Sequence, residues 1–308
     1  PIGGYRLDCS PYLGGAIETE ILLEELPVKK EALESLTKAI FNGPQFVRNY
    51  VTEPEFGVPF MTGSTMLLAD LSDLPLLCKP DAHGSKLRHL ELERGMSLIS
   101  CSGSIGKMAY AREEMTGVWS SQYILKVVPD PDRIPPGYLY AFLSSKFGVP
   151  LITSGTYGAI IQHLELQHIA KLSVPRFGAA LENEIHTLIE EASRLRTEAS
   201  QLKKIAICTF EKLCNIPLSK ALHSYPSPQF SCVNSKGLAE RMDSTYFIPS
   251  CIGSRAAFDQ LPDQKNLGEI ASVFIPNIFK RQYSSDPTFG YPYITGADVF
   301  CIRPGSNQ

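Results

Sequence analysis

The chain has 308 residues, of which 44% are hydrophobic and 20% are charged, and its formal net charge is −3. This composition is typical of a soluble protein with room for two domains, and it excludes a uniformly basic coat for nucleic acid. No apolar run approaches the length needed to cross a bilayer and no N-terminal segment resembles a signal peptide, so we expect a cytoplasmic protein without membrane contact.

Residues 1–177 have the mixed pattern of an α+β domain. Short apolar runs at residues 97–101 and 123–128 lie between glycines and prolines and predict strands. Apolar residues share one face of residues 137–148 after two prolines, which predicts a helix. The predicted fold class is therefore α+β.

Basic residues outnumber acidic ones between residues 79 and 112. Because the whole chain is acidic, any anion-binding surface has to be local. We interpret Lys86, Arg88 and His89 in this stretch as DNA contacts, and a solvated loop is the alternative.

A glycine-rich turn with the sequence SCSGSIGK follows the predicted strand, at residues 100–107. It is no Walker A loop, because Cys101 and Met108 stand where glycine and serine or threonine are required. Ser102, Ser104 and Lys107 remain as candidates for contact with a nucleic-acid backbone. An ordinary turn is the alternative.

A second polar turn lies at residues 156–163. Thr156, Tyr157 and Gln162 carry groups that can read base edges. His163 and His168 are five residues apart, which does not fit a helical metal pair, and the eight cysteines form no C-x-x-C pair. We therefore predict no metal site and reduced cysteines.

A long helix is predicted at residues 178–215. Ten positions follow alternating steps of four and three from residue 181 to residue 213, and nine of them are apolar, with Thr209 as the exception. The stretch contains no glycine or proline, as in a coiled coil. The helix would be roughly 50 Å long. The residues expected to pack against a partner helix are Ile185, Leu188, Leu195, Leu202 and Leu213. Packing on a single globular domain is the alternative.

A proline- and serine-rich linker is predicted at residues 216–236, and the start of the chain then recurs. RLDCS at residues 6–10 is echoed by RMDST at 241–245, FVRNY at 46–50 by FKRQY at 279–283, and GVPFMTGS at 57–64 by GYPYITGA at 290–297, with an offset that drifts from 235 to 233. A period this long indicates a repeated domain, so residues 237–308 predict the N-terminal part of a second copy, truncated at Gln308.

The repeat retains arginine and tyrosine where their neighbours change, as Arg48 with Tyr50 and as Arg281 with Tyr283. The functional interpretation places each arginine on a phosphate or base edge and lets each tyrosine donate to the DNA backbone. The alternative is a structural pair with the tyrosine packed and the arginine solvated.

Catalytic motifs are absent from the sequence. It contains no Asp/Asn-Pro-Pro-Tyr/Phe run, no G-x-S-x-G and no H-E-x-x-H. We therefore expect a binding protein and not an enzyme.

Taken in order, these segments resemble the DNA specificity (S) subunit of type I restriction-modification systems, which serve in phage defence. The similarity is carried by residues 57–64, 99–107 and 157–175, by the long helix that directly follows the last of these, and by the repeat. It implies two target recognition domains, each of which reads half of a split double-stranded DNA target, with a conserved spacer helix between them.

The resemblance also implies partners. These are methyltransferase (M) subunits that use S-adenosylmethionine and restriction/translocase (R) subunits that use ATP and Mg²⁺, so no cofactor is expected on this chain. Self-association through the helix is left open, because the second helix of the family is missing here. Two further alternatives are a related system whose methyltransferase and nuclease are fused in the partner, and an assembly scaffold that no longer reads DNA.

Overall fold

The computed structural model describes residues 15–157, 163–164, 166–214, 230–238, 242–275, 280–284, 286–296 and 299. The chain divides into two compact units, whose main parts are Pro1–Ser200 and Gln201–Tyr291. The domain boundaries that the sequence predicts at residues 177, 215 and 236 stay predictions.

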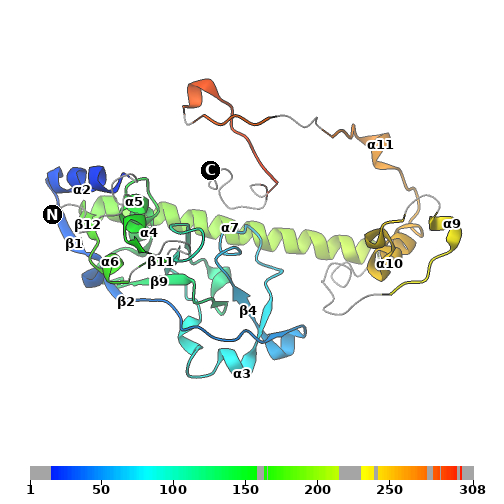
Figure 1. The fold of residues 1–308 in the computed structure, drawn as a ribbon, viewed down its shortest axis with the longest axis horizontal. Coiled ribbons are helices and arrows are strands. Elements are labelled where there is room, and N and C mark those ends of the chain that lie inside the picture. The colour runs from blue at the N-terminus through cyan, green and yellow to red at the C-terminus, as the bar shows by residue number, and fades with distance from the viewer. Residues whose placement is uncertain are drawn as a thin grey trace. The chain divides into compact units, whose positions relative to one another are not determined.

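A four-stranded antiparallel sheet lies at the centre of the first unit (Figure 1). Its strand order is β2 (Thr37–Phe41), β9 (Ile124–Pro129), β6 (Ser97–Ser100) and β7 (Met108–Tyr110). β6 and β9 confirm the two predicted strands. Both are buried almost throughout, because other elements cover the two faces of the sheet.

A second four-stranded sheet covers one face of the central sheet. Its order is β3 (Tyr50–Val51), β5 (Leu76–Cys78), β4 (Gly57–Met61) and β8 (Trp119–Ser120), with β4 and β8 parallel. The two sheets share an apolar cluster that includes Met61 of β4 together with Leu98 and Ile124 of the central sheet. The second sheet, the short helix α3 (Lys79–Ala82) and the 3₁₀ turn Arg88–Leu90 are called the β4 lobe below.

Helices cover the other face of the central sheet. They are α2 (Ala16–Glu25), α4 (Pro136–Leu143), α5 (Gly148–Ser154), α6 (Leu166–Ala170) and the first part of α7 (Ala179–Cys214). Their apolar side chains join Leu125 and Val127 of β9 in the largest buried cluster. Two short antiparallel pairs complete the unit, β1 (Lys29–Ala32) with β12 (Ser173–Arg176) and β10 (Thr156–Tyr157) with β11 (His163–Leu164). The predicted α+β class is thus confirmed.

The helix predicted at residues 137–148 is wrong as a single element, since α4 ends at Leu143 and α5 begins at Gly148. The hydroxyl of Ser145 accepts hydrogen bonds from the backbone N–H groups of Phe147 and Gly148, at 3.2 and 3.1 Å. These bonds satisfy the free donors that start a new helix.

The long helix is confirmed as α7, which has 36 residues and a length of about 54 Å (Figure 1). Three polar side chains spaced by four, Glu182, His186 and Glu190, anchor it to the first unit. The Glu182 carboxylate accepts two hydrogen bonds from the Arg176 guanidinium, at 2.8 and 3.0 Å, and a third from the backbone N–H of Phe177.

The other two anchors lie one and two turns further along α7. His186 Nδ1 accepts a hydrogen bond from the backbone N–H of Gly137 at 3.0 Å. The Glu190 carboxylate accepts hydrogen bonds from the Tyr110 hydroxyl and from Arg94. Burial and the nearby Glu190 carboxylate raise the pKa of Tyr110, so that its hydroxyl keeps its proton.

The apolar seam of α7 mostly faces away from these anchors. Ile185 packs against the largest core cluster, whereas Leu188, Leu195, Leu202 and Leu213 are exposed. The first unit therefore contacts α7 mainly through another face, and the interpretation of the four leucines as partner contacts stays a prediction.

Apart from the end of α7, short helices are the regular elements of the second unit's described residues. They are α9 (Ser235–Leu238), α10 (Pro249–Phe258) and α11 (Leu267–Ile270), with 3₁₀ turns at Ser244–Phe247 and Pro287–Phe289. Two of them follow the sequence repeat: α10 lies 233 residues after α2, and the turn Pro287–Phe289 lies 233 residues after the turn Pro54–Phe56.

No strand forms among the described residues from 230 onward. In the first copy, each strand between residues 29 and 61 pairs with a strand at Leu76 or later.

Candidate nucleic-acid interface

Three polar segments that are far apart in the sequence meet beside the turn between β6 and β7. A Cβ atom on Gly63 would lie 3.4 Å from the Ser100 hydroxyl, which places the loop after β4 against the end of β6. Ser102 and His163 form an isolated antiparallel β-bridge through their backbones, and the backbone N–H of Leu164 donates to the carbonyl of Cys101 at 3.3 Å. The segment at residues 99–107 therefore contacts both of the other segments that carry the family resemblance.

Hydroxyl groups are prominent in these segments. The Thr62 and Ser64 hydroxyls lie 2.9 Å apart, and Ser104 is exposed at the tip of the β6–β7 turn. Gly103 and Gly106 have φ angles of 74° and 82°, which glycine adopts without strain. We call residues 62–65 and 101–107 with the β10–β11 pair the hydroxyl loops. Their hydroxyls can donate to phosphates and can both donate to and accept from base edges.

Lys107 lies at the side of these loops and not at their tip. It is half-buried and lines a pocket of about 340 Å³ with Tyr140 and Arg196. The side chain of Lys107, predicted to contact a phosphate, is therefore less exposed than the sequence suggests.

The remaining predicted residues of this turn have different surroundings. Thr156 is buried, so its side chain does not present itself to a partner. The backbone of Tyr157 pairs with His163 in the β10–β11 ladder. Gln162 lies outside the described residues.

The connection between β2 and β3, residues 42–49, runs from the hydroxyl loops to the β4 lobe. Arg48 donates to the Gln122 side chain at 3.2 Å, and the Cys101 thiol donates to the Gln122 carbonyl at 3.8 Å. The Arg48 guanidinium also stacks on the buried Phe60 ring, 5.4 Å from its centroid. Arg48 thus points inward and positions this segment, and no sequence pattern identified Gln122 as its partner.

Tyr50 joins the same cluster from β3. Its ring lies 6.1 Å from that of Phe60, and about half of the side chain is exposed. Arg48 and Tyr50 therefore both pack on Phe60, but the alternative of a packed tyrosine with a solvated arginine is reversed, since Arg48 is the more buried of the two.

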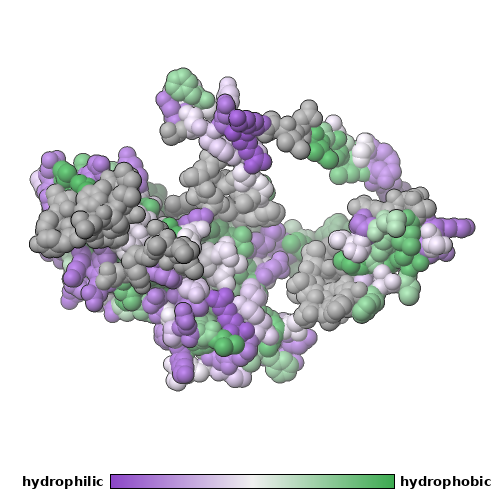
Figure 2. Space-filling model, in the orientation of Figure 1, coloured by the Kyte–Doolittle hydropathy of each residue, from purple (hydrophilic) through white to green (hydrophobic). Residues whose placement is uncertain are grey.

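Lys86, Arg88 and His89 are exposed on the β4 lobe. Burial, and to a lesser degree the charge of Lys126, lower the pKa of His89, which favours a neutral ring able to donate and accept. The His89 ring lies 5.7 Å from that of Phe41, where the connection to β3 begins. Figure 2 shows hydrophilic and hydrophobic residues interspersed over the part of the unit where α3 lies.

The basic stretch at residues 79–112 does not form one surface. Arg112 is buried and pairs with Glu114, and Arg94 pairs with Glu190 of α7. Sequence counting could not separate these arginines from the exposed Lys86 and Arg88, because the pairing of Arg94 with α7 and the burial of Arg112 arise only in the folded chain.

The second copy presents its matching residues differently. Arg281 and Tyr283 are exposed. The packing seen around Phe60 requires the paired strands of the first copy, and these do not form among the described residues from 230 onward.

Neither a metal cluster nor a membrane helix emerges from the described part of the chain. No group of three or more His, Cys, Asp or Glu side chains there is arranged to hold a metal ion. No helix in the same residues has the length and apolar character that crossing a bilayer requires.

No protein-family profile and no curated protein matches this sequence. Among solved structures, the fold is similar to the type I restriction-modification S subunit from M. genitalium, with 17% identity and a TM-score of 0.40 over 62% of this chain and 44% of that chain. The HsdS subunit from Thermoanaerobacter tengcongensis is similar with 14% identity and a TM-score of 0.40 over 60% and 46%.

A third similar structure is the type IIG restriction endonuclease BpuSI, with 11% identity and a TM-score of 0.42 over 60% of this chain and 28% of that chain. This chain therefore spans less than half the length of each of these three solved chains.

Proposed function

We propose that this chain is a DNA-binding specificity subunit of a type I restriction-modification system, in which each copy of the repeated domain reads half of a split target. The observation that supports this most is the convergence of the hydroxyl loops beside the β4 lobe with its exposed Lys86 and Arg88. Neutral groups that read bases, flanked by cations that neutralise phosphates and held on a rigid sheet, are what sequence-specific DNA binding requires.

The residues divide into two roles under this proposal. Lys86 and Arg88 contact phosphates and supply affinity that does not depend on sequence. Ser102, Ser104 and the segment at residues 42–49 approach the bases, while Arg48 and Tyr50 hold that segment on Phe60. The acidic net charge fits a subunit that shares its DNA affinity with partners.

The chemistry belongs to the partners in this proposal. Methyltransferase subunits with S-adenosylmethionine modify adenine, and restriction/translocase subunits use ATP and Mg²⁺. α7 separates the two readers, and a length of about 54 Å corresponds to roughly 15 base pairs of duplex, so two half-sites could lie at least one helical turn apart.

Sequencing of methylated bases from cells with and without the gene tests the function. A two-part adenine motif that disappears with the gene is expected, whereas an unchanged methylation pattern would overturn the proposal and favour a scaffold. Co-purification then shows whether the methyltransferase is a separate subunit or is fused to the nuclease.

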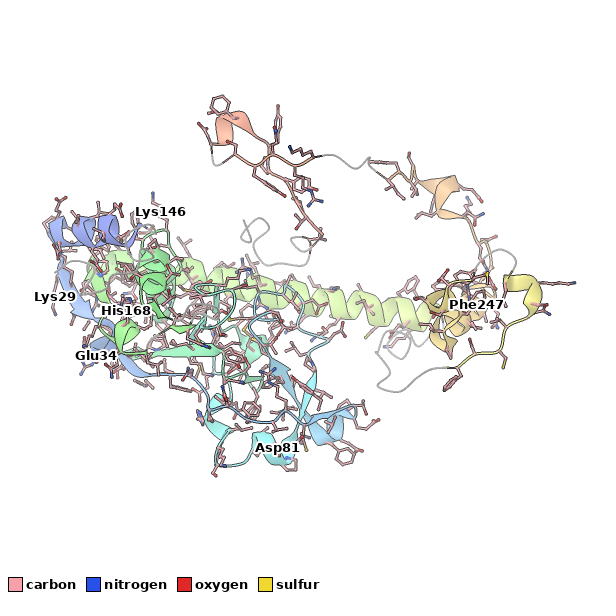
Figure 3. The ribbon with its side chains drawn as sticks, in the orientation of Figure 1. Lys29, Glu34, Asp81, Lys146, His168 and Phe247 are labelled. Carbon is pink, nitrogen blue, oxygen red and sulfur yellow. The ribbon has the colours of Figure 1, made fainter. Side chains whose placement is uncertain are left out.

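Charge contacts are tested on the complex purified from those cells. Lys86→Ala and Arg88→Ala should each weaken binding to all duplexes alike and reduce the salt dependence by about one counterion. Lys146→Ala is the matched control, because Lys146 is exposed on the same unit but lies far from Asp81 of the β4 lobe in Figure 3. Equal effects of all three substitutions would contradict a role for the β4 lobe.

A further inference from the structure

The segment before β3 alternates between packed and exposed side chains. Phe46 and Arg48 point inward, with the Phe46 ring 6.0 Å and the Arg48 guanidinium 5.4 Å from the Phe60 ring. Gln45, Val47 and Asn49 are exposed between and beside them. Phe60 itself is fully buried in β4, so it fixes which side of this extended segment faces out.

The sequence repeat follows the same alternation. The inward side chains Phe46 and Arg48 return unchanged as Phe279 and Arg281, and Tyr50, which also packs on Phe60, returns as Tyr283. The position of Phe60 is occupied by a second aromatic residue, Tyr293. The outward positions all change: Gln45, Val47 and Asn49 are matched by Ile278, Lys280 and Gln282.

Packing explains why the inward positions are kept, since an aromatic ring or a stacked guanidinium on Phe60 tolerates few replacements. Exposed positions without a role would also vary, so variation alone decides nothing. All three outward side chains are exposed, Val47 by 81%, so each is open to contact with a partner.

The surroundings of the outward residues favour DNA as that partner. Gln122 joins Arg48 to Cys101, so the segment borders the hydroxyl loops. On its other side, the Asn49 amide donates to Asp81 of α3 at 2.8 Å, which holds this side chain against the β4 lobe that carries Lys86. Figure 3 labels Asp81 at this edge of the first unit.

We infer that Gln45, Val47 and Asn49 select the bases read by the first domain, and that their counterparts select the bases of the other half-site. The inference rests on the proposed function. A glutamine or asparagine amide fits adenine, an apolar methyl fits the thymine methyl group, and the lysine found in the second copy fits guanine. The same packed residues would thus present different base-contacting side chains in the two copies.

The test transfers outward residues of the second copy into the first within the intact chain, expressed with its natural partners. Val47→Lys should replace thymine by guanine at one position of one half-site, with a preference of about tenfold or more, and leave the other half-site unchanged. Gln45→Ile should replace adenine by thymine at a neighbouring position. Sequencing of methylated bases reads both halves at once. Lys146→Ala is the control and should leave the motif unaltered.

The outcomes separate this inference from the proposed function. If the unaltered gene gives no split motif, the proposed function fails. If it gives one and Val47→Lys and Gln45→Ile leave that motif unchanged, only the inference is overturned. The inference is also overturned if Val47→Lys abolishes all methylation while the variant unfolds, by Trp119 fluorescence, like the original chain. Position 47 would then be needed for DNA binding of any sequence and not for the choice of base. Arg48→Lys should lower methylation without changing the motif.

Discussion

Replacement of Lys126 by methionine should stabilise the first unit at neutral and acidic pH. Lys126 lies in β9 with no exposed surface, between Phe41 and Leu98 on the neighbouring strands. Its ammonium group donates to the carbonyl of Ile124 at 3.2 Å and lies 5.3 Å from the centre of the Phe41 ring. No carboxylate pairs with it among the described residues, so burial lowers its pKa to about 7.

The sign of the pH dependence follows from that pKa. Between pH 7 and 10.5 the unfolded chain binds more protons than the folded one, so the free energy of unfolding rises with pH across this window. Below pH 7 Lys126 is charged in both states and the full burial penalty applies. A shift of this size corresponds to at most ~5 kcal/mol. Methionine removes this penalty, but it also loses the contact of Lys126 with the Phe41 ring and its hydrogen bond to Ile124, which together offset about 2 kcal/mol of the gain.

Urea unfolding followed by tryptophan fluorescence measures the effect, because Trp119 is the single tryptophan and is buried in the first unit. At pH 6 the Lys126→Met variant should be about 2–3 kcal/mol more stable than the original chain, and this advantage should be lost before pH 10. Lys38→Met, at an exposed position of β2, is the control and should show no such trend. A Lys126→Met variant that is less stable at pH 6, or that keeps the pH slope of the original chain, would refute the reasoning.

Two further substitutions test the anchoring of α7 in the same urea assay. Gly137→Ala should cost about 1–3 kcal/mol although alanine favours helices, because the new Cβ would lie 2.9 Å from the backbone oxygen of His186. A stabilising Gly137→Ala would contradict the close approach. Glu182→Gln should cost about 2 kcal/mol, because it weakens a buried ion pair with Arg176, and a cost below about 0.5 kcal/mol would show that this pair does not hold the helix.

Local periodicity was sufficient to predict the strands at β6 and β9 and the extent of α7. These elements depend on residues close in the sequence, and their patterns are long or bounded by clear breaks. The burial of Lys126 had no such signal, since a lysine within a strand normally indicates the solvent face. Only the pairing of β9 between two other strands, with a second sheet over it, removes that side chain from water.

The candidate interface was predicted in part. The three polar segments could be recognised from glycines, hydroxyls and their order, but their meeting depends on contacts such as Ser102 with His163, which no spacing rule supplies. The inward direction of Arg48 was equally hidden, because residues 42–49 form neither strand nor helix and have no period to follow. The repeat keeps the inward positions and changes the outward ones, but this distinction is recognised only once the structure shows which residues are exposed.

The polar character of the α7 anchors matters for a protein proposed to read a split target. An apolar seam alone lets a helix shift by a turn at small cost, since one leucine contact resembles the next. Glu182 and Glu190 each need particular donors, and a shift would leave carboxylates half or fully buried without them. The first turns of α7 therefore keep a fixed direction relative to the central sheet, while the exposed leucines remain free for a partner. A helix proposed to set the distance between two half-sites has to be held rigidly on the first domain at its start.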